Sequence, residues 1–250
     1  MKEKFWKFKA AADGKKNEGS LFIYGEIVSY QWDDSDTTAQ SFKKDLDALG
    51  DIGTLHVYVN SPGGSVFEGV AIHNILKRHK AKINIYVDGL AASIASVIAM
   101  AGDTIHMPEN SMMMVHNPWT MAWGNATDFR KAADDLDRIG ASMSESYLSK
   151  AGDKMEPDTL KNLLDNETWL SAKECFDYGF CDVVGEANQA AACVSEELFA
   201  KYRNVPEKVA QISQRSPETK ADELKLREEM IKEARQNAEA VKTYLGGITL

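Results

Sequence analysis

One serine and its surroundings carry the residue types that an acyl-transfer site needs. Ser93 lies in residues 88–96, with alanines before it and an apolar run after it. The glycine pair Gly63-Gly64 precedes it, and a lone histidine, His116, follows a later apolar stretch. A hydroxyl nucleophile, an imidazole base and accessible backbone amides are the groups that acyl transfer uses. The order of these residues along the chain therefore predicts an acyl-transfer site.

The context of Ser93 separates it from an ordinary serine at a helix start. Residues 83–87 predict a strand, residues 88–89 a turn, and residues 93–101 a helix that packs through small side chains. A strand-turn-helix bend presents the hydroxyl, and the helix N-terminus supplies positive potential and free N–H groups. The amide of Ile94 is therefore one expected donor to an oxyanion.

The glycine pair admits three interpretations: a simple turn, a phosphate cradle, or a site of backbone access. The Lys-Ser/Thr that completes a phosphate loop is missing after these glycines. Glycine lets main-chain N–H groups approach a substrate without hindrance from a Cβ atom. We therefore expect Gly64 to be the second oxyanion donor, with an extended peptide pairing as an added strand beside it.

A base and a carboxylate complete the predicted set. His116 ends an apolar strand, and a neutral imidazole near pH 7 accepts a serine proton. The third member, which orients the histidine, must be a carboxylate. Candidates cluster in residues 165–169, which contain Asp165 and Glu167. The other four histidines have neighbours typical of strand or helix faces: His56, His73, His79 and His106.

Strands and helices alternate along the chain, which predicts an α/β fold with a parallel sheet. One long amphipathic helix is expected at residues 127–150, with apolar residues at helical intervals. Further strands are expected at residues 21–24, 55–59, 83–87, 104–107, 112–115 and 182–184, and further helices at 37–49, 66–79, 93–101, 157–164 and 172–178.

Composition excludes several classes of protein. The chain has 250 residues, 44% of them hydrophobic, and a net charge of -9, which argues against nonspecific nucleic-acid binding. A secretory leader and an apolar run of about 20 residues are not found, so we expect a cytoplasmic protein without a membrane partner. Cys175, Cys181 and Cys193 lack a metal-binding spacing and are expected to be reduced thiols.

The chain divides into three expected parts. Residues 1–19 predict a flexible arm, and residues 20–186 predict the domain that holds the site. Residues 187–250 predict a linker and a charged helical extension. The apolar residues of that extension repeat every three to four positions, which fits either a helix that pairs with a partner or a solvated helix without one.

Several motifs, in order, resemble the proteolytic subunit of the Clp protease (ClpP) over residues 21–185. They are residues 60–64, 91–93, 115–118 and 170–182. Residues 88–93 and 167–169 resemble more closely the ClpP-like head maturation (prohead) proteases of tailed phages and prophages. The resemblance implies a spiral of ββα units shared with the crotonases and a protruding handle helix from Thr127.

The resemblance also implies roles for residues. Ser93 would be the nucleophile of a serine endopeptidase, His116 its base, and Gly64 with Ile94 its oxyanion donors, with no metal or other cofactor. ClpP carries an aspartate at the third position, and an ungapped match places Glu167 there, with Asp165 as the second candidate. Subunits would form homo-oligomeric rings that enclose the sites, and these rings would be able to stack on one another.

Four functions remain open from the sequence. The leading one is a maturation protease that cleaves capsid and scaffold proteins, in the host cytoplasm or the procapsid. The second is a housekeeping ClpP that works with an AAA+ unfoldase. The third is a crotonase-like acyl-CoA enzyme, which needs no serine–histidine pair. The fourth is a non-catalytic, ring-forming scaffold component.

Overall fold

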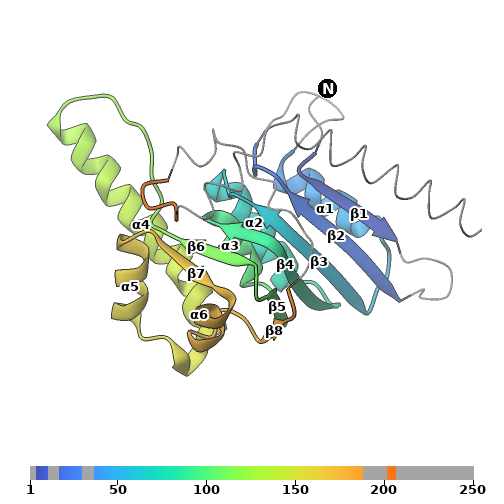
Figure 1. Cartoon of the computed structure of the whole chain (residues 1–250). Coiled ribbons are helices and arrows are strands. Elements are labelled where there is room, and N and C mark those ends of the chain that lie inside the picture. The colour runs from blue at the N-terminus through green and yellow to red at the C-terminus, as the bar shows by residue number, and fades with distance from the viewer. Residues whose placement is uncertain (1–3, 11–16, 30–36, 188–201, 207–250) are drawn as a thin grey trace, which may run out of the picture. The chain divides into compact units, whose positions relative to one another are not determined.

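The computed structural model describes residues 4–10, 17–29, 37–187 and 202–206 (Figure 1). Eight strands form one sheet, and the helices pack around it, which confirms the predicted α/β class with a long protruding helix. No helix among the residues in these ranges has the length and hydropathy that a membrane span requires.

Six strands form the main path of the sheet, in the order β1-β2-β3-β4-β5-β8, and β6 and β7 continue from β4. Pairing is parallel except between β1 and β2 and between β6 and β7, so the sheet is mixed rather than wholly parallel. The strands are β1 (Trp6–Ala10), β2 (Glu18–Tyr24), β3 (Thr54–Ser61), β4 (Lys82–Ala92), β5 (Thr104–Pro108), β6 (Met112–Val115), β7 (Thr168–Ser171) and β8 (Val183–Gly185).

The helices follow the predicted positions within a few residues. Two of them begin at a capping box, in which an N-cap side chain and the N3 carboxylate satisfy each other's backbone amides: α4 at Asn125 and α6 at Ser171. The helices are α1 (Ala39–Asp47), α2 (Val66–Lys77), α3 (Ile94–Ala99), α4 (Ala126–Ala151), α5 (Pro157–Asp165) and α6 (Ala172–Asp177), with a 3-10 turn at Gly152–Lys154.

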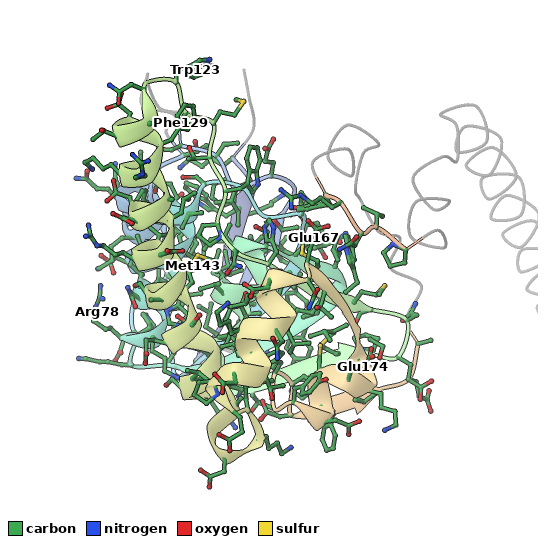
Figure 2. The ribbon with its side chains drawn as sticks, turned by 90° about the vertical axis from the view of Figure 1, so that its left-hand side faces the viewer. Arg78, Trp123, Phe129, Met143, Glu167 and Glu174 are labelled. Atoms are coloured by element: carbon green, nitrogen blue, oxygen red, sulfur yellow. The ribbon has the colours of Figure 1, made fainter. Side chains whose placement is uncertain are left out.

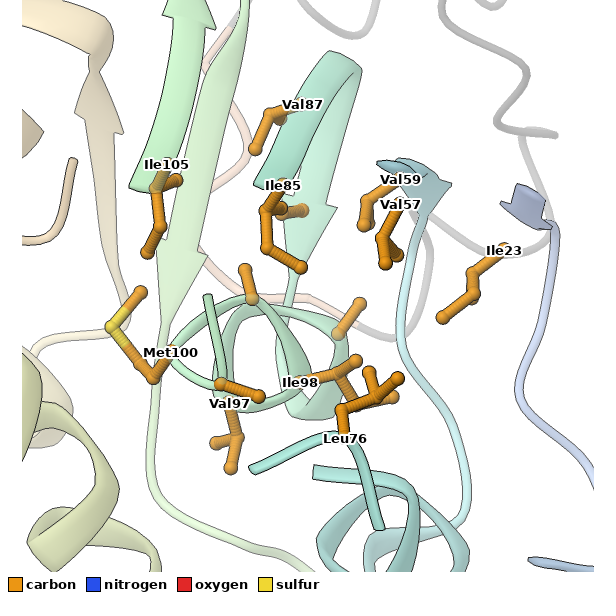
Figure 3. Packing of buried hydrophobic residues seen from close by; sticks show 14 of the residues in the cluster. Ile23, Val57, Val59, Leu76, Ile85, Val87, Val97, Ile98, Met100 and Ile105 are labelled. Carbon is orange, nitrogen blue, oxygen red and sulfur yellow. The ribbon is translucent and has the colours of Figure 1, made fainter. Parts of the chain in front are cut away.

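Helices α2 and α3 cover one face of the sheet and form the core with it (Figure 3). Every residue of α3 is buried, and a Cβ atom added at Gly69 of α2 would lie 2.2 Å from Ile94 Cγ1. This close approach requires glycine and fixes the position of α3. The apolar sheet residues facing the helices include Ile23, Val57, Val59, Ile85, Val87 and Ile105.

The opposite face of the central strands carries a row of stacked rings. Phe22, Tyr58, Tyr86 and His106 occupy one register row across β2, β3, β4 and β5. Their ring centroids lie 4.9, 5.2 and 4.7 Å apart in succession, with nearly parallel planes. Because side chains alternate between the two faces of a strand, this row and the core share the same strands.

Helix α4 extends past the domain at its N-terminal end. Its buried residues lie in the second half, at Gly140, Met143, Tyr147 and Ala151. The apolar stripe continues into the first half, where Ala132 and Leu136 are half-buried and Phe129 is 53% exposed. Figure 2 shows Phe129 at the far end of the helix from the domain, beyond Met143. Half of this helix is therefore a projection.

One expectation about the division of the chain needs correction. The flexible-arm prediction for residues 1–19 is wrong in part, because Trp6–Ala10 forms β1 and β2 already begins at Glu18. Trp6 is buried against Phe42 of α1, with ring centroids 5.5 Å apart, and its Nε1–H donates to Asp45. Burial of these rings offsets the entropy lost on ordering the segment.

The remaining expectations for the chain's ends stay predictions. The charged helical extension lies outside the described residues, except for 202–206.

One strand was not expected from the sequence. Thr168–Ser171 forms β7.

Candidate active site

Ser93 lies on a strained bend between β4 and α3. Its backbone has φ 55° and ψ −129°, a region that residues with a Cβ atom rarely adopt. Such a conformation costs about 1–3 kcal/mol, so its surroundings must hold it in place. The amide of Ser93 donates to the carbonyl of Met114, and its carbonyl accepts from the amide and hydroxyl of Ser96. The bend leaves the hydroxyl half-buried and directed at the histidine.

Strand register brings the serine and the histidine together. β4 and β6 are parallel neighbours, with Ala92 opposite Met114. Ser93 and His116 each lie just beyond this pair, at the same end of the two strands. The distance between Ser93 Oγ and His116 Nε2 is 2.7 Å, within hydrogen-bond reach.

Burial keeps the His116 imidazole neutral. Only 8% of the residue is exposed, and this desolvation lowers its pKa below the ordinary 6.5. The carboxylate of Glu167 opposes the shift by raising the pKa, and the guanidinium of Arg203 adds to it by lowering the pKa. A neutral imidazole at pH 7 has a free lone pair for the serine proton.

The glycine pair brings backbone amides to the same place. Gly64 forms a parallel bridge with Ile27: the Ile27 amide donates to Gly63 O, and the Ser65 amide donates to Ile27 O. In a parallel bridge of this kind, the N–H of the central residue points away from its neighbour, so that of Gly64 faces the opposite side.

Neither glycine tolerates a side chain. A Cβ atom at Gly64 would lie 2.0 Å from Ile27 O, and one at Gly63 would lie 2.7 Å from the Cβ atom of Ser93. The loop therefore packs directly on the serine bend. Ile94, at the first position of α3, has no carbonyl one turn earlier in the helix for its amide. The amides of Gly64 and Ile94 therefore remain the expected oxyanion donors.

Two clefts meet at His116. One, of about 290 Å³, is lined by Ser93, Gly64 and Trp119 among others and opens onto the serine side of the imidazole. The other, of about 450 Å³, is lined by Glu167 and Asn204 among others and lies on the carboxylate side. A substrate in the first cleft would reach the hydroxyl and the glycine loop together.

Glu167 reaches the histidine through the second strand pairing. β6 and β7 are antiparallel, with Val115 opposite Thr168, so the next residues outward are His116 and Glu167. Oε2 of Glu167 lies 4.0 Å from His116 Nδ1, an ion-pair distance that exceeds hydrogen-bond reach. The residue is buried, and its backbone has φ 47°.

Asp165, the second candidate, faces other partners. It is the last residue of α5, so the extended backbone that would turn it toward the imidazole is not present. Its exposed carboxylate accepts from the side-chain amide of Asn117 and pairs with Lys161. Of the two candidates, the structure places Glu167 beside His116.

Three residues beyond the predicted domain also contact this site. The amides of Arg203 and Asn204 donate to Glu167 Oε1 at 2.6 and 2.8 Å. Tyr202 donates its hydroxyl to Pro62 O, and its ring meets His116 edge-on at 5.7 Å between centroids. Sequence reasoning missed Arg203 and Asn204 because they act through backbone amides, which every residue except proline has, so no residue type marks them.

The site has no signs of a metal centre. Within the described ranges, no three His, Cys, Asp or Glu side chains are grouped as metal ligands. Cys175 and Cys181 are buried free thiols, and burial raises the pKa of both.

A serine on a strand-to-helix bend, an imidazole on its hydroxyl and glycine-loop amides beside it define the class of serine hydrolases. The family model for Clp protease matches residues 17–188, more than half of the chain. The chain therefore belongs to the Clp protease family of serine peptidases, whose members act on protein substrates and typically form oligomeric rings.

Proposed function

We propose that this chain is a serine endopeptidase whose nucleophile is Ser93 and whose base is His116. The observation that carries the proposal is the 2.7 Å contact between Ser93 Oγ and His116 Nε2 in an open cleft. Glu167 orients the imidazole and balances its charge, and the amides of Gly64 and Ile94 bind the oxyanion. No metal or other cofactor takes part.

The reaction begins when His116 Nε2 takes the proton of the Ser93 hydroxyl. Oγ attacks the peptide carbonyl carbon, and the carbonyl electron pair moves onto oxygen, where the two amides donate to it. The carbon–nitrogen bond then breaks, and the imidazolium gives its proton to the leaving amine. Water, deprotonated by the same imidazole, hydrolyses the acyl-enzyme and restores Ser93.

The cleft suits an extended peptide. The free edge of the Gly64 loop offers main-chain groups that pair with a substrate backbone whatever its side chains. We propose further that the substrates are capsid and scaffold proteins cleaved during phage head maturation, by homo-oligomeric rings in the host cytoplasm or procapsid. The amino-acid sequence of residues 88–93 and 167–169 resembles that of the phage proteases, and this resemblance supports this substrate class.

Ser93→Ala tests the proposal. We expect the variant to lose labelling by a fluorophosphonate probe and to leave a co-expressed capsid protein at its full intact mass, whereas the wild type trims it. The matched control is Ser144→Ala, since the Ser144 hydroxyl only bonds Gly140 O within α4. Labelling of Ser93→Ala at the wild-type rate would contradict the peptidase assignment.

The substrate class has a separate readout. Trimming of capsid protein without any nucleotide supports a maturation protease. Degradation of a folded test protein only in the presence of an AAA+ unfoldase and ATP would instead assign the housekeeping role. Particle maturation that proceeds unchanged with Ser93→Ala would leave only a scaffold role.

A further inference from the structure

The segment Tyr202–Asn204 lies outside the family-matched residues 17–188, yet it contacts three parts of the candidate site. It belongs to the same compact unit, which ends at Pro206. We propose that this segment, the strap, is a positioning element that holds Glu167 in place for His116. The proposal rests on the proposed peptidase function.

The strap occupies one oxygen of the carboxylate and leaves the other for the imidazole. Oε1 of Glu167 accepts from two successive amides, those of Arg203 and Asn204, while Oε2 lies toward His116 Nδ1. Hydrogen bonds from amides to a carboxylate are charge-assisted and stronger than neutral ones. Glu167 needs such support, because its own backbone at φ 47° is strained.

The strap is itself held by contacts with residues next to Glu167 and with the glycine loop. The side-chain amide of Asn204 donates to Asn166 O at 2.8 Å, next to Glu167 in the chain. Tyr202 donates to Pro62 O in the glycine loop, and its ring packs edge-on against Trp169 at 5.8 Å. The strap thus connects the glycine loop, the histidine and the carboxylate, which no strand pairing does directly.

A longer side chain explains why the strap is needed. Glutamate has one more rotatable bond than aspartate, so more conformations must be excluded to keep its carboxylate beside an imidazole. Two fixed amides exclude those conformations. The strap therefore performs for a glutamate what a shorter side chain obtains from its own geometry.

The test compares Asn204→Pro, which deletes the amide, with Asn204→Ala, which keeps it and loses only the bond to Asn166 O. Both are made in the full chain and assayed by the rate of fluorophosphonate labelling of Ser93. We expect Asn204→Pro to slow labelling about 10-fold to 100-fold, as misplacement of a catalytic group by about 1 Å does. Asn204→Ala should slow labelling by less than a tenth as much as Asn204→Pro does.

A pH profile distinguishes positioning from a general loss of structure. The groups that face His116 are the Ser93 hydroxyl, Glu167, Arg203 and the Tyr202 phenol. Glu167 raises the pKa of His116, so a released carboxylate should move the acid limb of labelling to lower pH. Arg203→Ala is the opposite control, because loss of its cation should move the limb to higher pH.

A double variant decides whether the strap acts through Glu167. Once Glu167→Gln is present, adding Asn204→Pro should cost little more, because the two changes remove the same interaction. The strap proposal would be overturned if Asn204→Pro and Asn204→Ala were labelled at equal rates, or if Asn204→Pro were labelled faster than the wild type. It would also be overturned if the losses of rate from Glu167→Gln and Asn204→Pro multiplied in the double variant. Labelling that survives Ser93→Ala would instead overturn the peptidase itself.

Discussion

The two sides of the His116 imidazole are built differently. On the serine side, Nε2 lies 2.7 Å from Ser93 Oγ; on the glutamate side, Nδ1 lies 4.0 Å from Glu167 Oε2. Both neighbours have positive φ, and they are the two non-glycine residues in the described ranges that do. Backbone strain is therefore common to both sides, whereas the contact with the imidazole is close on one side alone.

The difference lies in what supports each neighbour. Ser93 is held by adjoining elements: its amide bonds β6, and its carbonyl bonds Ser96, whose hydroxyl lies 2.6 Å from the buried Tyr147 hydroxyl. Glu167 is held by amides more than 30 residues away in the chain. A nucleophile supported by the neighbouring strand and its own helix keeps its geometry, while a carboxylate supported by a distant segment depends on that segment's position.

Apart from the loss of Ser93 itself, Gly64→Ala should impair the serine side of the site most strongly. The new Cβ atom would lie 2.0 Å from Ile27 O, so the loop must shift and carry its amide away from the oxyanion position. Loss of one oxyanion donor lowers turnover by about 10²–10³. Steady-state hydrolysis of a fluorogenic peptide measures the effect.

Gly185→Ala is the matched control, because a Cβ atom there meets nothing within 4 Å. It should keep wild-type turnover. Turnover of Gly64→Ala equal to that of this control would show that the loop amide does not stabilise the oxyanion.

Glu167→Gln should have a smaller effect, on the other side. Loss of a carboxylate bonded directly to the histidine costs about 10⁴ in turnover, and at 4.0 Å we expect about 10² at most. The carboxylate raises the pKa of His116, so its loss should also lower the pH at which activity falls on acidification. The pH dependence of labelling measures both.

Asp165→Asn provides the comparison, since Asp165 pairs with Asn117 and Lys161. It should leave both the rate and the acid limb as in the wild type. If Asp165→Asn slowed labelling more than Glu167→Gln, the two residues would have to exchange roles.

Tyr147→Phe should have the smallest effect on chemistry and sharpen the account of the serine side. It removes one fully buried hydroxyl that bonds Ser96 Oγ, so the free energy of unfolding should fall by about 1 kcal/mol in urea titrations. Ser96 keeps its own bonds to Ser93 O, and labelling should slow less than in Gly64→Ala. Slowing as large as in Gly64→Ala would mean that α4 controls the bend.

Much of the fold and of the serine side could be predicted from the sequence. Alternating apolar runs and helical periods gave the order of strands and helices, because burial selects those periods locally. Ser93, Gly64 and His116 could be singled out because a nucleophile, a bare backbone and a base need particular residue types. β1 was missed because its basic residues conceal a strand whose Trp6 packs on α1.

Residue types alone therefore determined which groups this protein can use in chemistry. The tertiary structure decided which of them meet: β4 and β6 placed Ser93 at His116, and β6 with β7 placed Glu167, not Asp165, beside the same ring. It also decided the role of Arg203 and Asn204, whose contribution to Glu167 comes from backbone amides. Amides are common to nearly all residues, so only their position in space distinguishes them.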